Sequence, residues 1–312
     1  MTAATVHFVH EGTAYLPELA AYQAFLRTRS AQGVIHRTPH TVPHDARFVW
    51  WMCGRVSHAE TQRFPQAWQV HEYASASVPP MAWTKDIVKR WAQPRPHYRI
   101  FQNAWVRQRF GFRDDVPCEL RDMGVPDAVA QACDAPQPAP LHDFVYLGEM
   151  RRLAQFMPVL AAIRQAGWRL LLIGDIPMSL QPRLLQGDGT TYTGRVAQQD
   201  VPALLRTARC GLNLVPPQLP FTQQTSTKLL EYCAAGLRVI STDYAWAREF
   251  AERHQAHLTY LGHRGAEPAL HIPALEQALQ APCALPAGAL ASQAWSRVVE
   301  RMPVWREMGL LP

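Results

Sequence analysis

The stretch TSTKLLEYCAAGLRVISTD, residues 225–243, places hydroxyl, basic and acidic side chains at the beginning of a predicted helix. Hydroxyls at residues 225–227 cap free N–H groups, and these groups together with the helix dipole attract anions. Lys228 can hold a phosphate, and Glu231, one turn later, can accept hydrogen bonds from a ribose diol. The alternative is a Lys228–Glu231 salt bridge on an exposed helix face, which contributes roughly a few tenths of a kcal/mol.

Two further loops carry side chains suited to a diphosphate. Arg151 and Arg152, in LGEMRR, follow a predicted strand at the start of a helix. Gly194 and Arg195, in TGRVAQQD, repeat that arrangement. Ligands of open α/β sheets bind at the carboxyl ends of the strands, where such loops meet. An isolated arginine pair is more often surface charge. The prediction of an anion site therefore rests on the combination of these loops.

Alternating strands and helices must position these loops. WRLLLIG (168–174) is a near-continuous apolar run of the kind that a parallel sheet buries on both faces, and CDAPQPAPLHD (133–143) has the composition of a linker. We expect two doubly wound α/β domains, residues 1–138 and 139–290, and a helix at 291–312 that packs back on the first domain. The expected strands are 5–10, 47–52, 68–73, 98–101, 144–148, 168–174, 190–194, 210–216 and 238–242, and the expected helices 16–29, 83–92, 151–166, 198–208, 226–235 and 292–311.

Composition and missing motifs exclude several classes of protein. A hydrophobic fraction of 48% over 312 residues is typical of a globular chain of about two domains. The sequence has no GxGxxG after its first strand, no GxxxxGK[ST], no GxSxG and no DxD, which argues against a dinucleotide fingerprint, a P-loop, an α/β-hydrolase and a metal–diphosphate site. Six scattered cysteines predict reduced core residues. Because neither a signal peptide nor a membrane span is evident, we expect a cytoplasmic protein.

Residues 85–113 combine basic and aromatic side chains. Eight basic residues stand there against one acid, Asp86, with six aromatic residues interleaved. An anionic membrane surface or an acidic substrate fits this pattern, and so does a solvated face with aromatic core behind it. No nucleic-acid-binding motif accompanies the stretch, so nucleic acid is not an expected partner.

Together the segments after residue 143 resemble the C-terminal, donor-binding domain of GT-B glycosyltransferases of the family 4 type. The resemblance is carried by YLGEMRRLAQFMPVLAAI, YTGRVAQQDVPALLRTARCGLNLVP and TSTKLLEYCAAGLRVISTD. The last is similar to the family's S-x-K-x-x-E-Y-x-A-x-G-x-P-V-I signature, with Arg238 where proline is usual. The similarity runs from about residue 143 to 300 and is weak over residues 1–140.

The resemblance implies two Rossmann-like doubly wound domains that face each other across a cleft. It implies transfer of a sugar from a nucleotide-diphosphate donor, such as a UDP- or GDP-sugar, to a glycan or lipid-linked acceptor, with retention and without a metal or other cofactor. Polysaccharide biosynthesis on the cytoplasmic side, with peripheral membrane attachment through residues 85–113, is the expected setting. Two alternatives remain open, a nucleotide-sugar 2-epimerase on the same fold and an inactive protein that binds a sugar nucleotide or glycan.

The resemblance also implies roles for individual residues. Glu231 matches the glutamate that binds the ribose, and the catalytic candidates are His71, Glu72 and Lys228, with His71 and Glu72 expected at the end of a strand facing the cleft. Gly12 and Thr13 are expected in an acceptor or phosphate loop. The expected donor-binding residues are Gly148, Arg151, Arg152, Gly194, Arg195, Gln223, Thr225, Ser226, Thr227, Lys228 and Glu231.

Two further positions depart from the family pattern. Gln223 stands where the E-x7-E motif has its first glutamate, which contacts the donor sugar. The pair Gly148-Glu149 stands where Gly-Arg is usual after the first strand of the second domain, so the arginine role passes to Arg151 or Arg152. A changed sugar contact and a loss of activity are both compatible with these departures.

Overall fold

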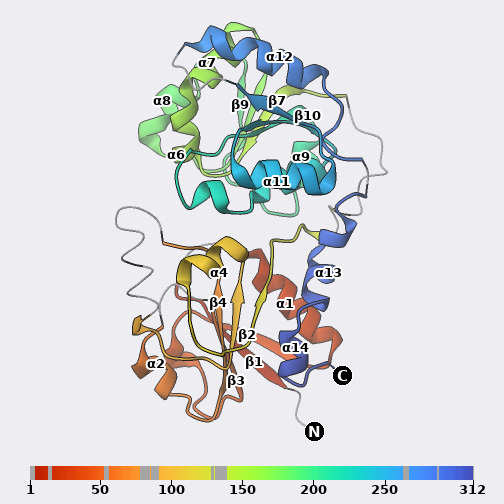
Figure 1. Ribbon diagram of the computed structural model, residues 1–312. Helices are drawn as coiled ribbons and strands as arrows, with labels where there is room; N and C mark the ends of the chain where they lie inside the picture. The colour runs from red at the N-terminus through yellow and green to blue at the C-terminus, as the bar shows by residue number, and fades with distance from the viewer. Residues whose placement is uncertain are drawn as a thin grey trace. The chain divides into compact units, whose positions relative to one another are not determined.

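A computed structural model describes the chain in two compact units. The described residues are 4–311 without 13–15, 53–55, 78–84, 86–90, 128–129, 131–138, 263–266 and 287. Unit 1 comprises Met1–Gly124 and Gln293–Pro312, and unit 2 comprises Val125–Ser292 (Figure 1). The sequence placed the first boundary at residue 138, inside a predicted linker that lies mostly outside the described residues. The predicted helix at 83–92 also falls largely outside them.

Unit 1 is built on a parallel six-stranded sheet. Its order is β2-β1-β3-β4-β5-β6, so the connections change direction between β1 and β3. Aromatic and β-branched runs such as FVWWM of β3 are buried on both faces, as a doubly wound sheet requires. The strands are β1 (Thr5–Val9), β2 (Gln32–His36), β3 (Phe48–Met52), β4 (Trp68–Tyr73), β5 (Tyr98–Phe101) and β6 (Cys118–Leu120).

The two ends of the chain meet in unit 1. Trp305, fully buried, packs against Tyr22, Phe25 and Trp50, with ring centroids 4.9–5.8 Å apart. The helix predicted at 292–311 is divided into two, because Pro303 cannot continue a helix. The helices of unit 1 are α1 (Pro17–Thr28), α2 (His58–Gln62), α4 (Ala104–Phe110), α13 (Trp295–Glu300) and α14 (Val304–Glu307), with the 3-10 helices η1 (Pro39–Thr41) and η7 (Ala291–Gln293) near them.

Unit 2 is built on a second parallel six-stranded sheet. Its order, β12-β11-β10-β7-β8-β9, is that of a dinucleotide-binding Rossmann domain, with the reversal between β7 and β10. In this fold, ligands bind outside the carboxyl ends of the strands at that reversal. The strands are β7 (His142–Leu147), β8 (Leu170–Ile173), β9 (Thr190–Tyr192), β10 (Ala208–Asn213), β11 (Arg238–Thr242) and β12 (Leu258–Leu261).

Helices cover both faces of this sheet. On one face, apolar residues of α7 and α12 such as Leu160 and Leu275 join the core around Phe144. On the other face, Tyr232 of α10 lies on Gly211 of β10, where an added Cβ would meet its ring at 2.4 Å. The helices are α6 (Met150–Leu153), α7 (Met157–Gln165), α8 (Gln181–Leu184), α9 (Val201–Leu205), α10 (Thr227–Ala234), α11 (Ala245–His254) and α12 (Ile272–Gln280), and the 3-10 helices η3 (Ala154–Phe156), η4 (Met178–Leu180), η5 (Phe221–Gln223) and η6 (Pro268–His271).

Candidate functional site

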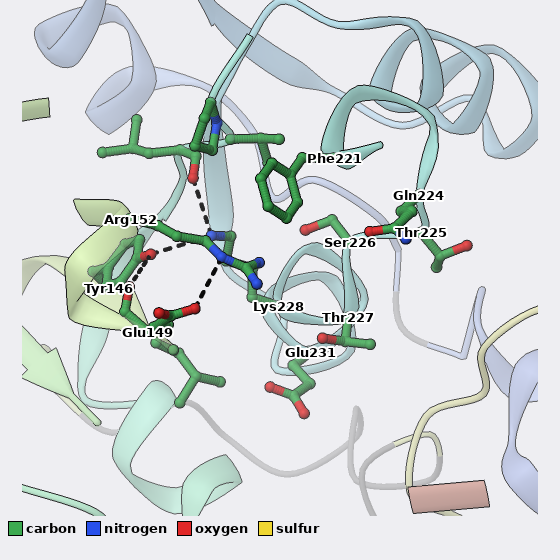
Figure 2. Close-up of a pocket in the computed structure, with 15 residues that line it drawn as sticks. Tyr146, Glu149, Arg152, Phe221, Gln224, Thr225, Ser226, Thr227, Lys228 and Glu231 are labelled. Atoms are coloured by element: carbon green, nitrogen blue, oxygen red, sulfur yellow. Dashed lines mark hydrogen bonds and ion pairs between the residues drawn. The ribbon is translucent and has the colours of Figure 1, made fainter. Parts of the chain in front are cut away.

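A pocket of about 250 Å³ lies in unit 2 at the reversal of strand order (Figure 2). Its walls are the carboxyl ends of β7 and β10, the start of α6, the segment before α10 and the first turns of α10. This is the place that the strand order predicts for a ligand. We call it the unit 2 pocket.

The start of α10 is held in place by a buried polar network. Ser226 is the N-cap, and its hydroxyl accepts a hydrogen bond from the Leu229 amide (3.4 Å). The same hydroxyl donates to Oδ1 of Asn213 (2.8 Å), and Nδ2 of Asn213 donates to Ser241 (2.9 Å) and Tyr244 (3.1 Å). Because the first N–H groups of a helix have no partner within the helix, this fixed terminus is suited to an anion.

Lys228 projects from α10 into the unit 2 pocket. Its Nζ donates to the Leu214 carbonyl (3.0 Å) and the Tyr146 hydroxyl (3.5 Å), and it lies 4.7 Å from the centroid of the Tyr146 ring (Figure 2). Burial, and then the nearby charge of Arg152, lower the pKa of Lys228 to about 7. Within the described part of the chain Lys228 forms no ion pair with Glu231, so the salt-bridge alternative is wrong.

Glu231 lies one turn further along α10, on the side of Lys228 away from Tyr146 (Figure 2). Burial raises the pKa of Glu231 to about 7, although a hydrogen bond from Nε2 of Gln198 (3.0 Å) acts in the opposite direction. The pocket therefore holds a lysine and a glutamate that are both partly buried and that form no ion pair with any residue the structure describes. A ligand that brings phosphate oxygens to one and hydroxyls to the other would satisfy both.

Arg152 supplies a second cation from the start of α6. Its guanidinium lies 4.5 Å from the centroid of the Phe221 ring, and its Nε pairs with the Glu149 carboxylate at 3.1 Å. Both side chains of this ion pair are about half exposed, at 45% and 52%. Glu149 thus brings a negative charge to the mouth of the pocket, next to the cation that Arg152 supplies.

Glycine is required where the backbone lines the unit 2 pocket. Gly148, at the end of β7, has φ of +127° and open space where a side chain would stand. Gly174, at the end of β8, has φ of +135°, and a Cβ there would meet the Gly148 carbonyl oxygen at 2.3 Å. The two chain segments therefore approach as only glycine allows, which leaves room for a ligand above Gly148.

The unit 2 pocket gathers most of the donor-site residues expected from the sequence. The ones that line it are Gly148, Arg152, Thr225, Ser226, Thr227, Lys228 and Glu231. Arg151, Gly194, Arg195 and Gln223 do not line it. Tyr146 and Phe221 line it but were not expected. Tyr146 had a usable signal, because it is an aromatic residue next to the last position of β7, at the predicted edge, whereas Phe221 begins the short 3-10 helix η5, which shows no such pattern in the sequence.

His71 and Glu72 lie in the interior of unit 1. Strand β4 has the bounds expected from the sequence, so His71 and Glu72 lie near its end, but both side chains are buried, with exposed fractions of 0% and 1%. Glu72 pairs with Arg121 and accepts a hydrogen bond from Nε1 of Trp50 (2.8 Å). Burial lowers the pKa of His71 to about 3, so its ring is neutral. These contacts are those of core residues, although Nε2 of His71 has no hydrogen-bond partner among the described residues.

The loop after β1 is described only in part. Gly12 is exposed, and its carbonyl accepts a hydrogen bond from Arg37 (2.8 Å). An added Cβ at Gly12 would meet the His10 ring at 2.9 Å. Thr13 lies outside the described residues, so the acceptor or phosphate loop stays a prediction.

Acidic residues immediately after residue 113 neutralise part of the basic stretch. Arg99, buried, pairs with Asp114, and Arg95 pairs with Asp115. The aromatic residues around Phe101 and Phe110 form a core cluster with Tyr73. A window that ends at residue 113 stops just before both carboxylates, which is why the sequence overstated the positive charge.

The structure describes four of the six cysteines, which were expected to be reduced core residues. Cys210 and Cys233 are buried free thiols as expected, but Cys118 and Cys283 are exposed, so the prediction of core positions is wrong for these two. Cys53 and Cys133 lie outside the described residues.

None of the helices in the described ranges is long and apolar enough to cross a lipid bilayer.

Comparison with known proteins identifies the class of the fold and finds a family that residues 142–275 resemble. Residues 142–275 match the family described as glycosyl transferases group 1, in agreement with the resemblance found in the sequence. Together with the two parallel six-stranded sheets, the structural matches confirm the expected GT-B fold. The chain matches no curated protein sequence.

Solved glycosyltransferase structures align over nearly the whole chain. AviGT4, involved in avilamycin A biosynthesis, aligns at a TM-score of 0.64 and 15% identity over 98% of this chain and 96% of its own. A glycosyltransferase from Rickettsia africae aligns at 0.64 and 11% over 99% of both chains. HepE from Anabaena, solved with UDP and glucose, aligns at 0.64 and 12% over 99% and 100%. At these identities the likeness establishes the fold alone.

Proposed function

We propose that this protein is a glycosyltransferase whose unit 2 pocket binds the nucleoside diphosphate of a sugar donor. One observation carries the proposal: Lys228, Arg152 and the fixed start of α10 converge on the pocket where the order of the sheet reverses. A diphosphate is the anion that fits two cations and a helix terminus, and Glu231 stands nearby for the ribose diol. The glycosyl transferases group 1 match over the same residues supports this assignment.

The charges account for how the leaving group would be stabilised. When the sugar leaves, negative charge builds on the diphosphate, and preorganised cations and N–H groups aimed at that charge lower the barrier. Lys228 and Arg152 supply such cations from the chain itself, so we propose a transfer that needs no metal. Retention of configuration, and a glycan or lipid-linked acceptor, are proposed from the family resemblance.

The alternatives give different products. A 2-epimerase would convert the donor without an acceptor, and an inactive binding protein would leave it unchanged. Incubation with the donor alone, followed by product analysis, separates these outcomes. A transferase is expected to give transfer with an acceptor and at most slow hydrolysis without one.

UDP or GDP is expected to raise the melting temperature without added Mg²⁺. At a ligand concentration about 100 times Kd, binding adds about 2.7 kcal/mol to the free energy of unfolding, or roughly 5–10 °C for a unit of this size. Thermal shift in the presence of EDTA measures it. Stabilisation that appears only with Mg²⁺ would contradict metal independence, and no stabilisation by any nucleoside diphosphate would contradict the donor site itself.

Glu149→Gln is expected to tighten UDP or GDP binding by about fivefold. The carboxylate competes with the diphosphate for Arg152 and repels it, and removing one such charge at the pocket mouth is worth about 1 kcal/mol. Isothermal titration at low and high salt measures the change, which should shrink at high salt. Glu276→Gln, the same change on an exposed residue of α12 away from the pocket, is the control. Weaker binding in Glu149→Gln would show that Glu149 holds Arg152 in its working position.

Peripheral attachment to an anionic membrane through residues 85–113 stays a prediction. Arg107 and Arg113 are exposed and can contribute to it. The ion pairs of Arg95 and Arg99 leave fewer free cations than the sequence suggested. Flotation with anionic liposomes at low and high salt measures the attachment.

A further inference from the structure

A second cavity, of about 570 Å³, lies in unit 1 on the face of the sheet at its β5–β6 edge. Residues of α4, of the loop before β6 and of both strands line it. None of the donor-site residues belongs to this cavity. It is built largely from the basic and aromatic stretch at 85–113, for which the donor site gives no role. We call it the unit 1 cavity.

Arg99 forms a rigid wall of the unit 1 cavity. Its side chain is almost fully buried, both terminal nitrogens pair with the Asp114 carboxylate, and its guanidinium lies 3.9 Å from the centroid of the Phe112 ring. Its Nε has no hydrogen-bond partner, and neither has Nε2 of His71, the residue opposite Arg99 on β4. Both atoms are closed to solvent and His71 does not line the cavity, so the part of Arg99 that a ligand can meet is its guanidinium edge beside Asp114.

The charges of the unit 1 cavity argue against a polyanionic ligand. The charge of Arg99 is offset by Asp114, and that of Asp115 is offset by Arg95. Among the residues that the structure describes there, Arg107 is the cation left without an ion pair. One free positive charge suits a neutral or singly charged ligand better than a nucleotide or a polyphosphate.

The remaining lining offers both flat apolar surface and paired polar groups. Phe112, which is partly exposed, contributes apolar surface, whereas Phe101 is only 2% exposed. Arg107 and Gln108 lie on adjacent positions of α4 as hydrogen-bond donors, and the Asp114 carboxylate is an acceptor. A hydroxyl group both donates and accepts, so a ring that carries several hydroxyls can use both kinds of group while its C–H groups contact the apolar part of the lining.

We propose that the unit 1 cavity binds one sugar ring of a carbohydrate, at a site separate from the unit 2 pocket. Its volume lies within the range of small-molecule sites, about 300–1,000 Å³. A hexose has about twelve non-hydrogen atoms, and at about 0.3 kcal/mol per atom its Kd falls in the low millimolar range. The proposal does not depend on the donor site, because neither its residues nor its ligand involve a nucleotide.

Cys118 gives a direct readout of occupancy, because it lines the unit 1 cavity and its thiol is exposed. Alkylation by iodoacetamide, followed at Cys118 and Cys283 by mass spectrometry, is measured with glucose, galactose, N-acetylglucosamine and glucuronic acid at about 20 mM each. At least one sugar is expected to slow alkylation of Cys118 about threefold or more, as mass action predicts for a low-millimolar Kd. Cys283, exposed in unit 2, is the internal control and should react at an unchanged rate.

Matched arginine variants show whether the protection comes from this cavity. Arg107→Ala removes the free donor from an exposed helix position and should abolish protection without unfolding the chain. Arg113→Ala removes the same charge from an exposed residue of the same segment that does not line the cavity, and it should keep protection. Lys228→Met, which alters the unit 2 pocket, should also keep it.

Three results would overturn the proposal. The first is that none of the four sugars protects Cys118. The second is that both arginine variants lose protection equally, which would mean non-specific attraction. The third is that inorganic phosphate protects Cys118 as well as any sugar does, which would mean that the cavity binds anions. Loss of protection in Lys228→Met would likewise contradict a site separate from the unit 2 pocket. Failure of the nucleotide experiments would leave all of these measurements unaffected, so the two proposals fail independently.

Discussion

Lys228→Met is expected to lower the rate of sugar transfer about 100- to 1,000-fold while donor affinity falls much less. The charge of Lys228 matters most as the diphosphate leaves, and removing one preorganised electrostatic group at that step typically has this effect on kcat. Steady-state kinetics and donor titration measure the two quantities separately. Lys85→Met, which removes an exposed lysine of unit 1, is the control and should change neither. A higher KM with an unchanged kcat would mean that Lys228 stabilises the bound donor and the transition state equally.

Lys228→Met is also expected to change how the stability of the fold depends on pH, and this can be measured without a substrate. The pKa of Lys228 is lowered to about 7 in the folded protein, whereas an unfolded lysine keeps its ordinary value near 10.4. Holding the charged form in the pocket therefore destabilises the fold at and below about pH 7, and this penalty fades as the pH rises toward 10. The melting temperature of Lys228→Met minus that of the parent should thus be more positive at pH 7 than at pH 10. A difference that does not depend on pH would show that Lys228 is well solvated.

Glu231→Gln is expected to weaken UDP or GDP binding by roughly 10- to 150-fold at pH 8. The substitution keeps the shape but removes a charged acceptor, and a hydrogen bond to a charged group is worth about 1.5–3 kcal/mol. Because burial raises the pKa of Glu231 to about 7, the parent carboxyl becomes protonated below that pH and loses the same advantage. The ratio of parent to variant affinity should therefore shrink between pH 8 and pH 5.5.

The control for this measurement is Glu252→Gln, on the exposed surface of α11. It should leave donor affinity unchanged at both pH values. Equal affinity of Glu231→Gln and the parent at pH 8, in a protein with an unchanged melting temperature, would remove Glu231 from the donor site. A ratio that stays constant from pH 8 to 5.5 would show instead that Glu231 is ionised throughout.

Local patterns in the sequence predicted most of the elements but not their order. The apolar run that contains β8 and the runs of β1 and β3 are visible because parallel strands buried on both faces need continuous hydrophobic residues. β2, with the sequence QGVIH, and β6, with CEL, were missed because edge strands are short and partly exposed. The order of each sheet depends on contacts between residues far apart in the chain, and no local period encodes those contacts.

The donor site was predictable where one segment supplies several of its groups. Residues 225–231 form one helix start, so their spacing alone places Lys228 and Glu231 at the same pocket. Arg195 could not be judged in this way, because the direction of its loop depends on packing that the sequence does not show. The burial of His71 could not be judged for a related reason: the bounds of its strand were expected correctly, but whether a side chain near the end of a strand is exposed depends on packing that the sequence does not show.

The division of unit 1 into two chain segments has a consequence for folding during synthesis. Trp305 fills the space among Tyr22, Phe25 and Trp50, but it leaves the ribosome about 180 residues after the first boundary, which takes roughly 10–40 s at about 5–20 residues per second. Unit 2 is a single continuous segment and is complete before then. We therefore expect unit 2 to fold before unit 1. Until residues 293–312 have been synthesised, the aromatic core formed by the first 124 residues lacks Trp305.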